Sequence, residues 1–193
     1  MTVAHVRLFA GGAGTLLVGI LSDSHGRHLA VRQAMELFDK LGVSHVIHCG
    51  DVGSQEVFDE MIGRPLNFVW GNMDFPNDTG LLTYAQSLGL AIPQEVPVRI
   101  DLDAKRFAVF HGHEPGFNTA IQAARESCSP RSSRASVLTV DYILHGHTHA
   151  AGDEKLNGKR VINPGALHRA ARKTVATLDT ETDQLTFHEI RQA

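Results

Sequence analysis

Seven side chains able to bind metal ions each follow a short apolar run in this chain. They are Asp23, His25, Asp51, Asn72, His111, His147 and His149, within the segments ILSDSHG, IHCGDV, VWGNMD, VFHGH and ILHGHTH. Neighbouring strands lie about 4.8 Å apart, and parallel strands deliver the residues at their carboxyl ends to one edge of a sheet. We therefore expect these side chains to converge, as in a metal-binding enzyme.

The types of donor narrow the kind of site. Carboxylate, amide and imidazole groups without cysteine suit Mn, Fe, Zn, Ni or Co, and they favour an open catalytic site over a closed structural zinc site. Seven donors are too many for one ion but suit two ions that share a carboxylate. Asp51 lies centrally in the order and is expected to bridge them. Glycines beside the donors are expected to permit tight turns and close approach; these are Gly26, Gly50, Gly71, Gly112 and Gly146.

Alternating apolar runs and helical periodicities are expected to position the donors. Strands at 15–21, 43–48 and 66–70 with helices at 28–41 and 54–61 predict a βαβαβ unit and a parallel sheet. Further helices are expected at 81–89 and 118–127, a hairpin from 95–101 and 106–110, and a strand at 142–144. Segments 155–162 and 174–190 predict more hairpin strands, with turns at Asn157-Gly158 and near Thr182-Asp183. The fold class is α/β, with two mixed sheets and helices outside them.

Composition limits the classes of protein that remain. With 193 residues, 42% of them hydrophobic and 20% charged, the chain is expected to form a single domain over 1–193. A net charge of −3 argues against a stable nucleic acid complex, and no apolar stretch predicts a membrane partner. Two cysteines, Cys49 and Cys128, favour a reducing, cytoplasmic location. A homo-oligomer is left open. The serine-rich segment 127–136 is expected to be an exposed loop.

The segments DSH, GD, GNMD, HGH and GHTH resemble the motifs of the calcineurin-like metallophosphoesterase superfamily. INPGA at 162–166 is similar to the small prokaryotic phosphodiesterase branch related to the eukaryotic retromer subunit. The resemblance covers residues 17 to about 190. It implies the metallo-dependent phosphatase fold, a four-layer α/β/β/α sandwich of two mixed β-sheets flanked by helices. It also implies two divalent transition-metal ions, with manganese preferred, one held by Asp23, His25, Asp51 and His149 and the other by Asp51, Asn72, His111 and His147.

The activity that the resemblance implies is hydrolysis of small phosphodiesters by attack of a metal-bridging hydroxide. Asp51 and Asn72 would act in catalysis, and His113 would contact the phosphate or orient His111. The other histidines, among them His48 and His168, are not expected to bind metal. The alternatives are a phosphomonoesterase or nucleotide phosphatase, and a noncatalytic interaction module like the retromer subunit.

One departure from the superfamily pattern concerns the leaving group. Many members have histidine directly after the motif's asparagine, as a general acid or phosphate contact, and here that residue is Met73. A thioether cannot donate a proton, so diesters with good leaving groups are expected to be favoured. Asp74, which would orient that histidine, is left for another role. Two further groups have open interpretations: Asn163-Pro164-Gly165 as a turn or a support of the site, and Arg169, Arg172 and Lys173 as solvated surface or a phosphate contact.

Overall fold

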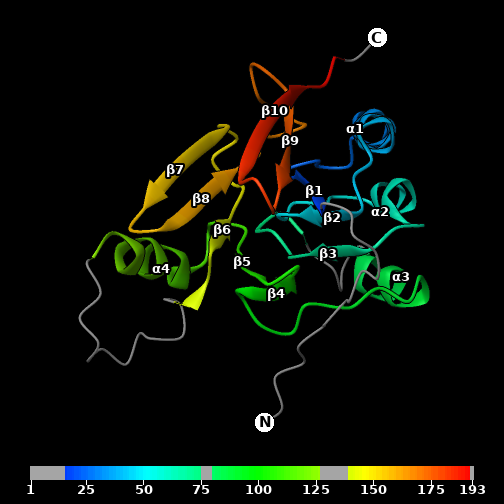
Figure 1. Cartoon of the computed structure of the whole chain (residues 1–193). Coiled ribbons are helices and arrows are strands. Elements are labelled where there is room, and N and C mark those ends of the chain that lie inside the picture. The colour runs from blue at the N-terminus through cyan, green and yellow to red at the C-terminus, as the bar shows by residue number, and fades with distance from the viewer. Residues whose placement is uncertain (1–15, 75–79, 127–138, 192–193) are drawn as a thin grey trace.

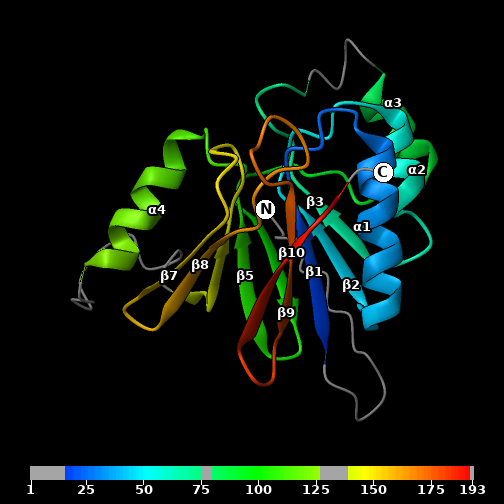
Figure 2. The same cartoon turned by 90° about the horizontal axis from the view of Figure 1, so that it is seen from above.

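The computed structural model describes residues 16–74, 80–126 and 139–191, and two five-stranded mixed sheets form its centre. One sheet has the strand order β10-β9-β1-β2-β3 and the other the order β4-β5-β6-β8-β7. Helices α1, α2 and α3 cover the outer face of the first sheet, and α4 covers that of the second (Figures 1 and 2). The four layers α/β/β/α expected from the resemblance are therefore confirmed.

The first sheet is built around the expected βαβαβ unit. Its elements are β1 (Leu17–Leu21), α1 (His28–Leu41), β2 (His45–His48), α2 (Gln55–Met61) and β3 (Leu66–Phe68), followed by α3 (Leu81–Ser87). β1 pairs in parallel with β2, and β2 in parallel with β3. The C-terminal hairpin of β9 (Thr174–Asp179) and β10 (Gln184–Glu189) extends the sheet, with β9 antiparallel to β1.

The second sheet combines two hairpins with one parallel strand between them. Its elements are β4 (Val98–Leu102), β5 (Lys105–Val109), α4 (Pro115–Arg125), β6 (Tyr142–Leu144), β7 (Gly152–Leu156) and β8 (Lys159–Asn163). β6 is parallel to both β5 and β8. The predicted turn at Asn157-Gly158 joins β7 to β8, and both of its residues have positive φ, as a two-residue hairpin turn requires.

Two of the expected element starts are wrong because of proline. The helix expected at 118–127 begins earlier, at Pro115, since proline suits the first helical position, where no amide donor is needed. The strand expected from residue 95 begins only at Val98, directly after Pro97, which has no N–H to give to a strand pair. Residues 127–138 lie outside the described residues, so the loop expected at 127–136 is not tested.

Three apolar clusters hold the four layers together. Val18, Ile20 and Ile47 of the first sheet meet Val109 and Leu144 of the second in the central cluster. Separate clusters lie between the first sheet and α1 to α3, and between the second sheet and α4. β1 and β2 are thus buried on both faces, which explains their nearly continuous apolar sequences. Within the described ranges, the structure contains no helix of the length and apolarity that a membrane span requires.

Candidate metal centre

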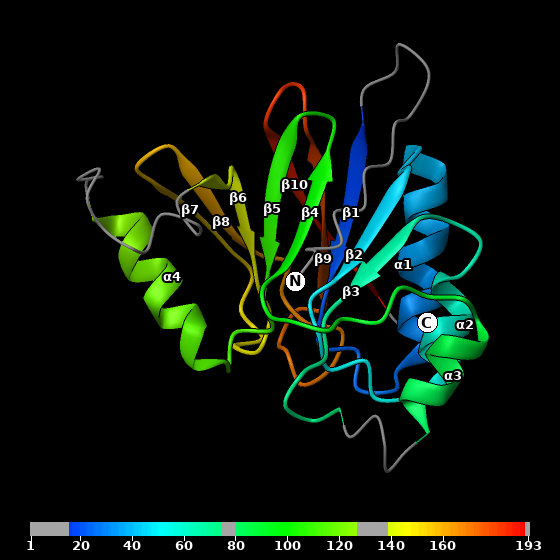
Figure 3. The same cartoon turned by 90° about the horizontal axis from the view of Figure 1, so that it is seen from below.

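The loops that follow β1 and β2 join directly beyond the ends of these strands. The amide of Asp23 donates to the carbonyl of Gly50 (3.0 Å), and the amide of His25 donates to the carbonyl of Asp51 (2.9 Å). The parallel pairing therefore continues into the two loops and places their donors next to one another. Strands β1, β2, β3 and β5 all end on this side of the molecule (Figure 3).

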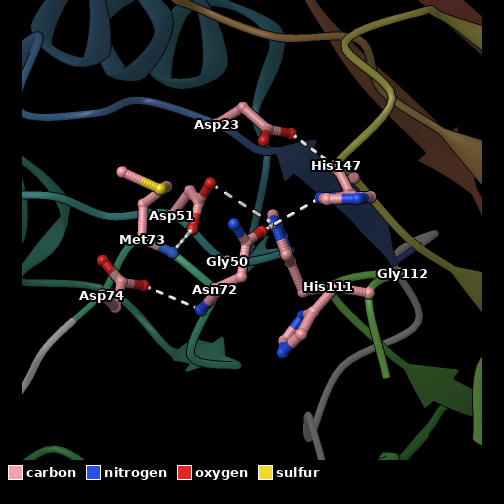
Figure 4. Close-up of polar contacts among 12 residues, drawn as sticks. Asp23, Gly50, Asp51, Asn72, Met73, Asp74, His111, Gly112 and His147 are labelled. Carbon is pink, nitrogen blue, oxygen red and sulfur yellow. Dashed lines mark hydrogen bonds and ion pairs between the residues drawn. The ribbon is translucent and has the colours of Figure 1, made fainter. Parts of the chain in front are cut away.

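All seven predicted donors converge here, and together they form what we call the donor cluster. In one half, His149 Nε2 lies 3.1 Å from Asp23 Oδ1 and 3.4 Å from His25 Nε2. In the other half, Asn72 Oδ1 lies 3.0 Å from both His111 Nε2 and His147 Nδ1 (Figure 4). A single oxygen, Asp51 Oδ2, lies between the halves, 3.5 Å from His25 Nε2 and 3.4 Å from His111 Nε2. The structure thus brings the seven side chains together, and their division between two ions stays a prediction.

One oxygen of the donor cluster lacks the hydrogen bond that it would need without a cation. Asp23 Oδ1 is buried and, although His149 Nε2 lies 3.1 Å away, it accepts no hydrogen bond, whereas Asp23 Oδ2 accepts from Ser22 Oγ (2.7 Å) and the His147 amide (3.0 Å). Burying an unpartnered carboxylate oxygen is expensive, and a bound cation removes that cost. The residues present therefore fit a metal ion.

The orientation of the His111 ring also fits a bound metal ion. Its Nδ1 lies 2.8 Å from the carbonyl oxygen of Cys49, which can only accept, so Nδ1 carries the proton. In the neutral ring, the lone pair of Nε2 then faces the oxygens of Asn72 and Asp51. Burial would lower the pKa of His111, but the contacts with Asp51 and Cys49 raise it above its ordinary value. A position that attracts a proton in this way also suits a metal ion.

Asp51 is held as a carboxylate by its neighbours. Burial acts to raise its pKa, but the contact with His111 and the hydrogen bond from the Met73 amide bring the pKa below its ordinary value. The Met73 N–H donates to Asp51 Oδ1 at 2.8 Å (Figure 4). The other oxygen, Oδ2, is left to face both His25 and His111. The Met73 side chain is 52% exposed, so this residue supports the cluster through its backbone.

Three of the five glycines beside the donors are required for space: Gly50, Gly71 and Gly146. A Cβ on Gly50 would lie 2.5 Å from His111 Nδ1. A Cβ on Gly71 would lie 2.0 Å from Asp51 Oδ1, and one on Gly146 would lie 2.6 Å from Asp23 Oδ2. Neither Gly71 nor Gly146 has a positive φ, yet both begin the tight turns that were expected: the Asp74 amide donates to the Gly71 carbonyl (3.2 Å) and the Thr148 amide to the Gly146 carbonyl (2.8 Å). Five of the donors themselves adopt left-handed backbone: Asp23, His25, Asp51, His147 and His149. That conformation is uncommon for residues with a Cβ.

Asp74 has a structural role that the sequence did not indicate. Its Oδ2 accepts from the amides of Gly71 (2.8 Å) and Val52 (3.1 Å), and its Oδ1 accepts from the amide of Gly53 (2.9 Å). It therefore ties the loop after β2 to the loop after β3. Burial raises its pKa, despite the three amide bonds that oppose the shift. Both of its oxygens are engaged, so it is not placed to orient a ring at position 73.

His48 and Ser24 form a second support that sequence reasoning missed. The Gly50 amide donates to His48 Nδ1 (3.2 Å), so the Nε2–H of the neutral ring donates to Ser24 Oγ (2.8 Å). Burial, the largest influence, lowers the pKa of His48 to about 3, which keeps the ring neutral. The expectation that His48 is not a donor to metal agrees with this position, but the residue fixes the loops that carry Asp23 and Asp51.

The second sheet positions its histidines through two further polar residues. Glu114 accepts from the amides of His111 (2.8 Å) and Gly112 (2.7 Å) at the N-cap of α4, and the Glu-Pro pair was the available signal for it. Asn163 donates to the Gly146 carbonyl (2.9 Å) and to Thr148 Oγ1 (3.0 Å). Its Oδ1 also accepts from the Gly165 amide (2.9 Å), so the segment both forms a turn and supports the site, and the two open interpretations hold together.

His113 and Cys49 lie at the edge of this arrangement. The His113 ring centroid is 5.4 Å from that of His111 and 6.2 Å from that of His147. The Cys49 carbonyl, not His113, bonds His111 Nδ1, so the orienting role suggested for His113 belongs to Cys49. The Cys49 thiol is buried with a raised pKa, caused mainly by burial, as expected of a small apolar side chain rather than a nucleophile.

The two facing sheets and the carboxylate, amide and imidazole cluster at their edge define the metallo-dependent phosphatase class of fold. A family profile for the calcineurin-like phosphoesterase superfamily domain matches residues 16–183. The chain therefore belongs to the calcineurin-like phosphoesterase superfamily, as the sequence resemblance implied.

Individual relatives agree with this membership. A protein of Methanocaldococcus jannaschii named as a phosphodiesterase is 28% identical over 168 residues, which are 85% of this chain and 93% of that protein. A probable metallophosphoesterase of Bacillus subtilis is 28% identical over 175 residues, which are 88% of this chain and 89% of that protein.

Solved structures show the same fold. An archaeal phosphodiesterase superposes with a TM-score of 0.73 at 25% identity, covering 90% of this chain and 99% of that chain. Vps29 of Entamoeba histolytica, solved with zinc, has a TM-score of 0.57 at 17% identity, covering 90% of this chain and 91% of that chain. At that identity the second likeness concerns the fold alone.

Proposed function

We propose that this protein is a dimetal phosphodiesterase that hydrolyses small phosphodiesters. The observation that carries the proposal is the position of Asp51 Oδ2 between His25 and His111, with four further donors around them. Asp23, His25, Asp51 and His149 would hold one ion, and Asp51, Asn72, His111 and His147 the other. Two divalent ions bound there, with manganese preferred, would polarise the phosphoryl group and lower the pKa of water.

The protein's own contribution is to hold the donors in position. The Met73 amide fixes one oxygen of Asp51, and the Cys49 carbonyl fixes the ring of His111. Asp74 and Glu114 hold the loops through backbone amides. Such preorganisation is the main protein contribution in phosphoryl transfer, because the transition state requires positioning and charge stabilisation more than covalent chemistry. His113, partly exposed beside His111 and His147, is a candidate contact to the substrate phosphate.

Two observations favour diesters over monoesters. The residue after Asn72 is an exposed methionine, which cannot protonate a poor leaving group. The relative from Methanocaldococcus jannaschii is named as a phosphodiesterase. We also infer a cytoplasmic location, which the buried free thiol of Cys49 supports. A noncatalytic interaction module would have no need for a buried carboxylate oxygen without a partner.

Metal analysis and a diesterase assay on Asp51→Asn test the proposal. The purified protein is expected to hold about two transition-metal ions and to hydrolyse bis(4-nitrophenyl) phosphate. Asp51→Asn is expected to lose both metal ions and the diesterase activity. The carboxylate between two dications offsets their mutual repulsion by several kcal/mol, and the neutral amide would not. Asp59→Asn, an exposed site on α2, is the matched control. If Asp51→Asn keeps both ions and normal turnover, the proposed function is wrong.

A further inference from the structure

Two arginines and a histidine form a group beside the donor cluster, on the side of His25. Arg27 Nε donates to His168 Nδ1 at 3.3 Å, and the His168 ring centroid lies 5.2 Å from that of His25. Arg27 is the N-cap residue of α1, whereas His168 and Arg169 belong to the segment between β8 and β9. Two segments distant in sequence thus meet here, and we call Arg27, His168 and Arg169 the cationic rim.

The two arginines of the cationic rim differ from five other arginines of the described residues. Arg32, Arg64, Arg106, Arg125 and Arg160 each form an ion pair with a carboxylate. Within residues 16–74, 80–126 and 139–191, neither Arg27 nor Arg169 does so, and both side chains are exposed. Their guanidinium groups therefore keep donors available beside a site suited to phosphate esters.

The local structure adds positive potential rather than offsetting it. α1 has no acidic residue in its first turn and no side-chain cap, so the positive end of its dipole is not neutralised locally. Arg27 stands at that end, where a cation is unfavourable for the helix. Because Arg27 donates to Nδ1 of His168, the neutral His168 ring carries its proton on Nε2 and offers one more donor.

We propose that the cationic rim binds a second phosphate group of the substrate, next to the diester that reacts at the metal centre. The preferred substrates would then be phosphodiesters that carry an additional phosphate monoester. This inference rests on the proposed function and narrows its substrate class. Arginine suits the role because its planar group forms two parallel hydrogen bonds with phosphate oxygens.

A matched pair of substrates tests the proposal: thymidine 5′-(4-nitrophenyl phosphate) with and without a 3′-phosphate. Both contain the same diester and leaving group, so the ratio of their kcat/KM values isolates the second phosphate. The ratio is expected to favour the 3′-phosphorylated ester in the wild type. This ratio should fall about tenfold in Arg27→Ala and in Arg169→Ala, because each loses one charge-assisted contact to the second phosphate. Arg27→Lys and Arg169→Lys keep the charge and should recover part of the ratio.

A binding measurement makes the test independent of turnover. Calorimetry is expected to give tighter binding of thymidine 3′,5′-bisphosphate than of thymidine 5′-monophosphate, with the difference reduced in Arg169→Ala. Arg125→Ala, which removes the same charge from α4 on the opposite face of the molecule, is the control and should leave both ratios unchanged. Metal content is measured for each variant, and if Arg27→Ala loses metal, Arg169→Ala decides the outcome.

The outcomes separate this inference from the proposed function. Equal kcat/KM values for the two esters and equal affinities for the two nucleotides in the wild type would overturn the cationic rim as a phosphate site. An equal effect of Arg125→Ala would also overturn it, because bulk charge would then explain the preference. If neither ester is hydrolysed but the bisphosphate binds more tightly through Arg169, the proposed function fails and the anion site stands.

Discussion

Replacement of Asp74 tests whether its hydrogen bonds or its charge hold the metal-centre loops. The carboxylate accepts from three backbone amides, those of Val52, Gly53 and Gly71. Asp74→Ala would leave all three without this acceptor. Each buried donor left unsatisfied costs about 1–3 kcal/mol, and removal of a buried charge offsets part of that cost. We therefore expect Asp74→Ala to lower the free energy of unfolding by about 3 kcal/mol.

Asp74→Asn separates the two effects. The asparagine oxygen can still accept from Gly71 and Val52, and only the bond to Gly53 is lost. Because burial raises the pKa of Asp74, the charge is already disfavoured in the fold. The neutral side chain should therefore lose about 1–2 kcal/mol, because only the Gly53 N–H is left without an acceptor and faces the asparagine NH2 group.

Urea unfolding of both variants, with and without a chelator, measures these losses. The chelated protein reports the loops alone, and the difference between the two conditions reports their contribution to metal binding. Asp59→Ala on the surface of α2 is the control and should cost less than about 1 kcal/mol. If Asp74→Asn destabilises the protein as much as Asp74→Ala does, the charge rather than the hydrogen bonds holds the loops, and our reasoning is wrong.

Three further predictions concern metal, leaving group and pH. Chelation should lower Tm by removing metal-binding energy, about 2.7 kcal/mol at one hundred times Kd, and circular dichroism should show the fold intact. Met73→His should flatten the dependence of rate on leaving-group pKa, because the new imidazole can protonate a poor leaving group. The gain in rate should be smaller than the roughly 10²-fold or more that a well-placed general acid supplies, since Asp74 cannot orient the ring. An unchanged slope would contradict this. His48 has its pKa lowered from 6.5 to about 3 by burial, so the unfolded chain binds a proton that the folded chain does not. Stability should therefore fall as pH drops from 6.5 towards 3, by at most about 1.4 kcal/mol per unit, and less steeply in His48→Gln.

The donor cluster could be predicted because strand geometry is local. Each donor follows an apolar run, and an apolar run that forms a parallel strand delivers its next residues to a known edge. The helix His28–Leu41 and the strand Tyr142–Leu144 were predicted with the bounds that the structure has, since their periodicity or composition is unambiguous. The start of α4 was wrong by three residues, because the apolar periodicity begins after Pro115 and Gly116, whereas proline suits the first turn of a helix.

The supports of the cluster could not be predicted, because they depend on how closely the loops approach one another. Nothing in the sequence places Asp74 opposite the amides of Val52 and Gly53, which lie more than twenty residues earlier in the chain. Likewise, the contact of Arg27 with His168 spans 141 residues. Such contacts arise only after the strands set the spacing of the loops, so motif spacing carries no signal for them.

The segment Gly71-Asn72-Met73-Asp74 shows why a site motif can keep its structural role with methionine in place of histidine. Gly71 leaves room for Asp51, Asn72 supplies a donor, and Asp74 holds the adjoining loop. Position 73 contributes its amide, which any residue except proline provides. Substitution of its side chain therefore leaves the positioning of Asp51 unchanged, and only the chemistry offered to the leaving group differs. It follows that metal binding and leaving-group preference are set by separate atoms of the same residue, and Met73→His should change the second without the first.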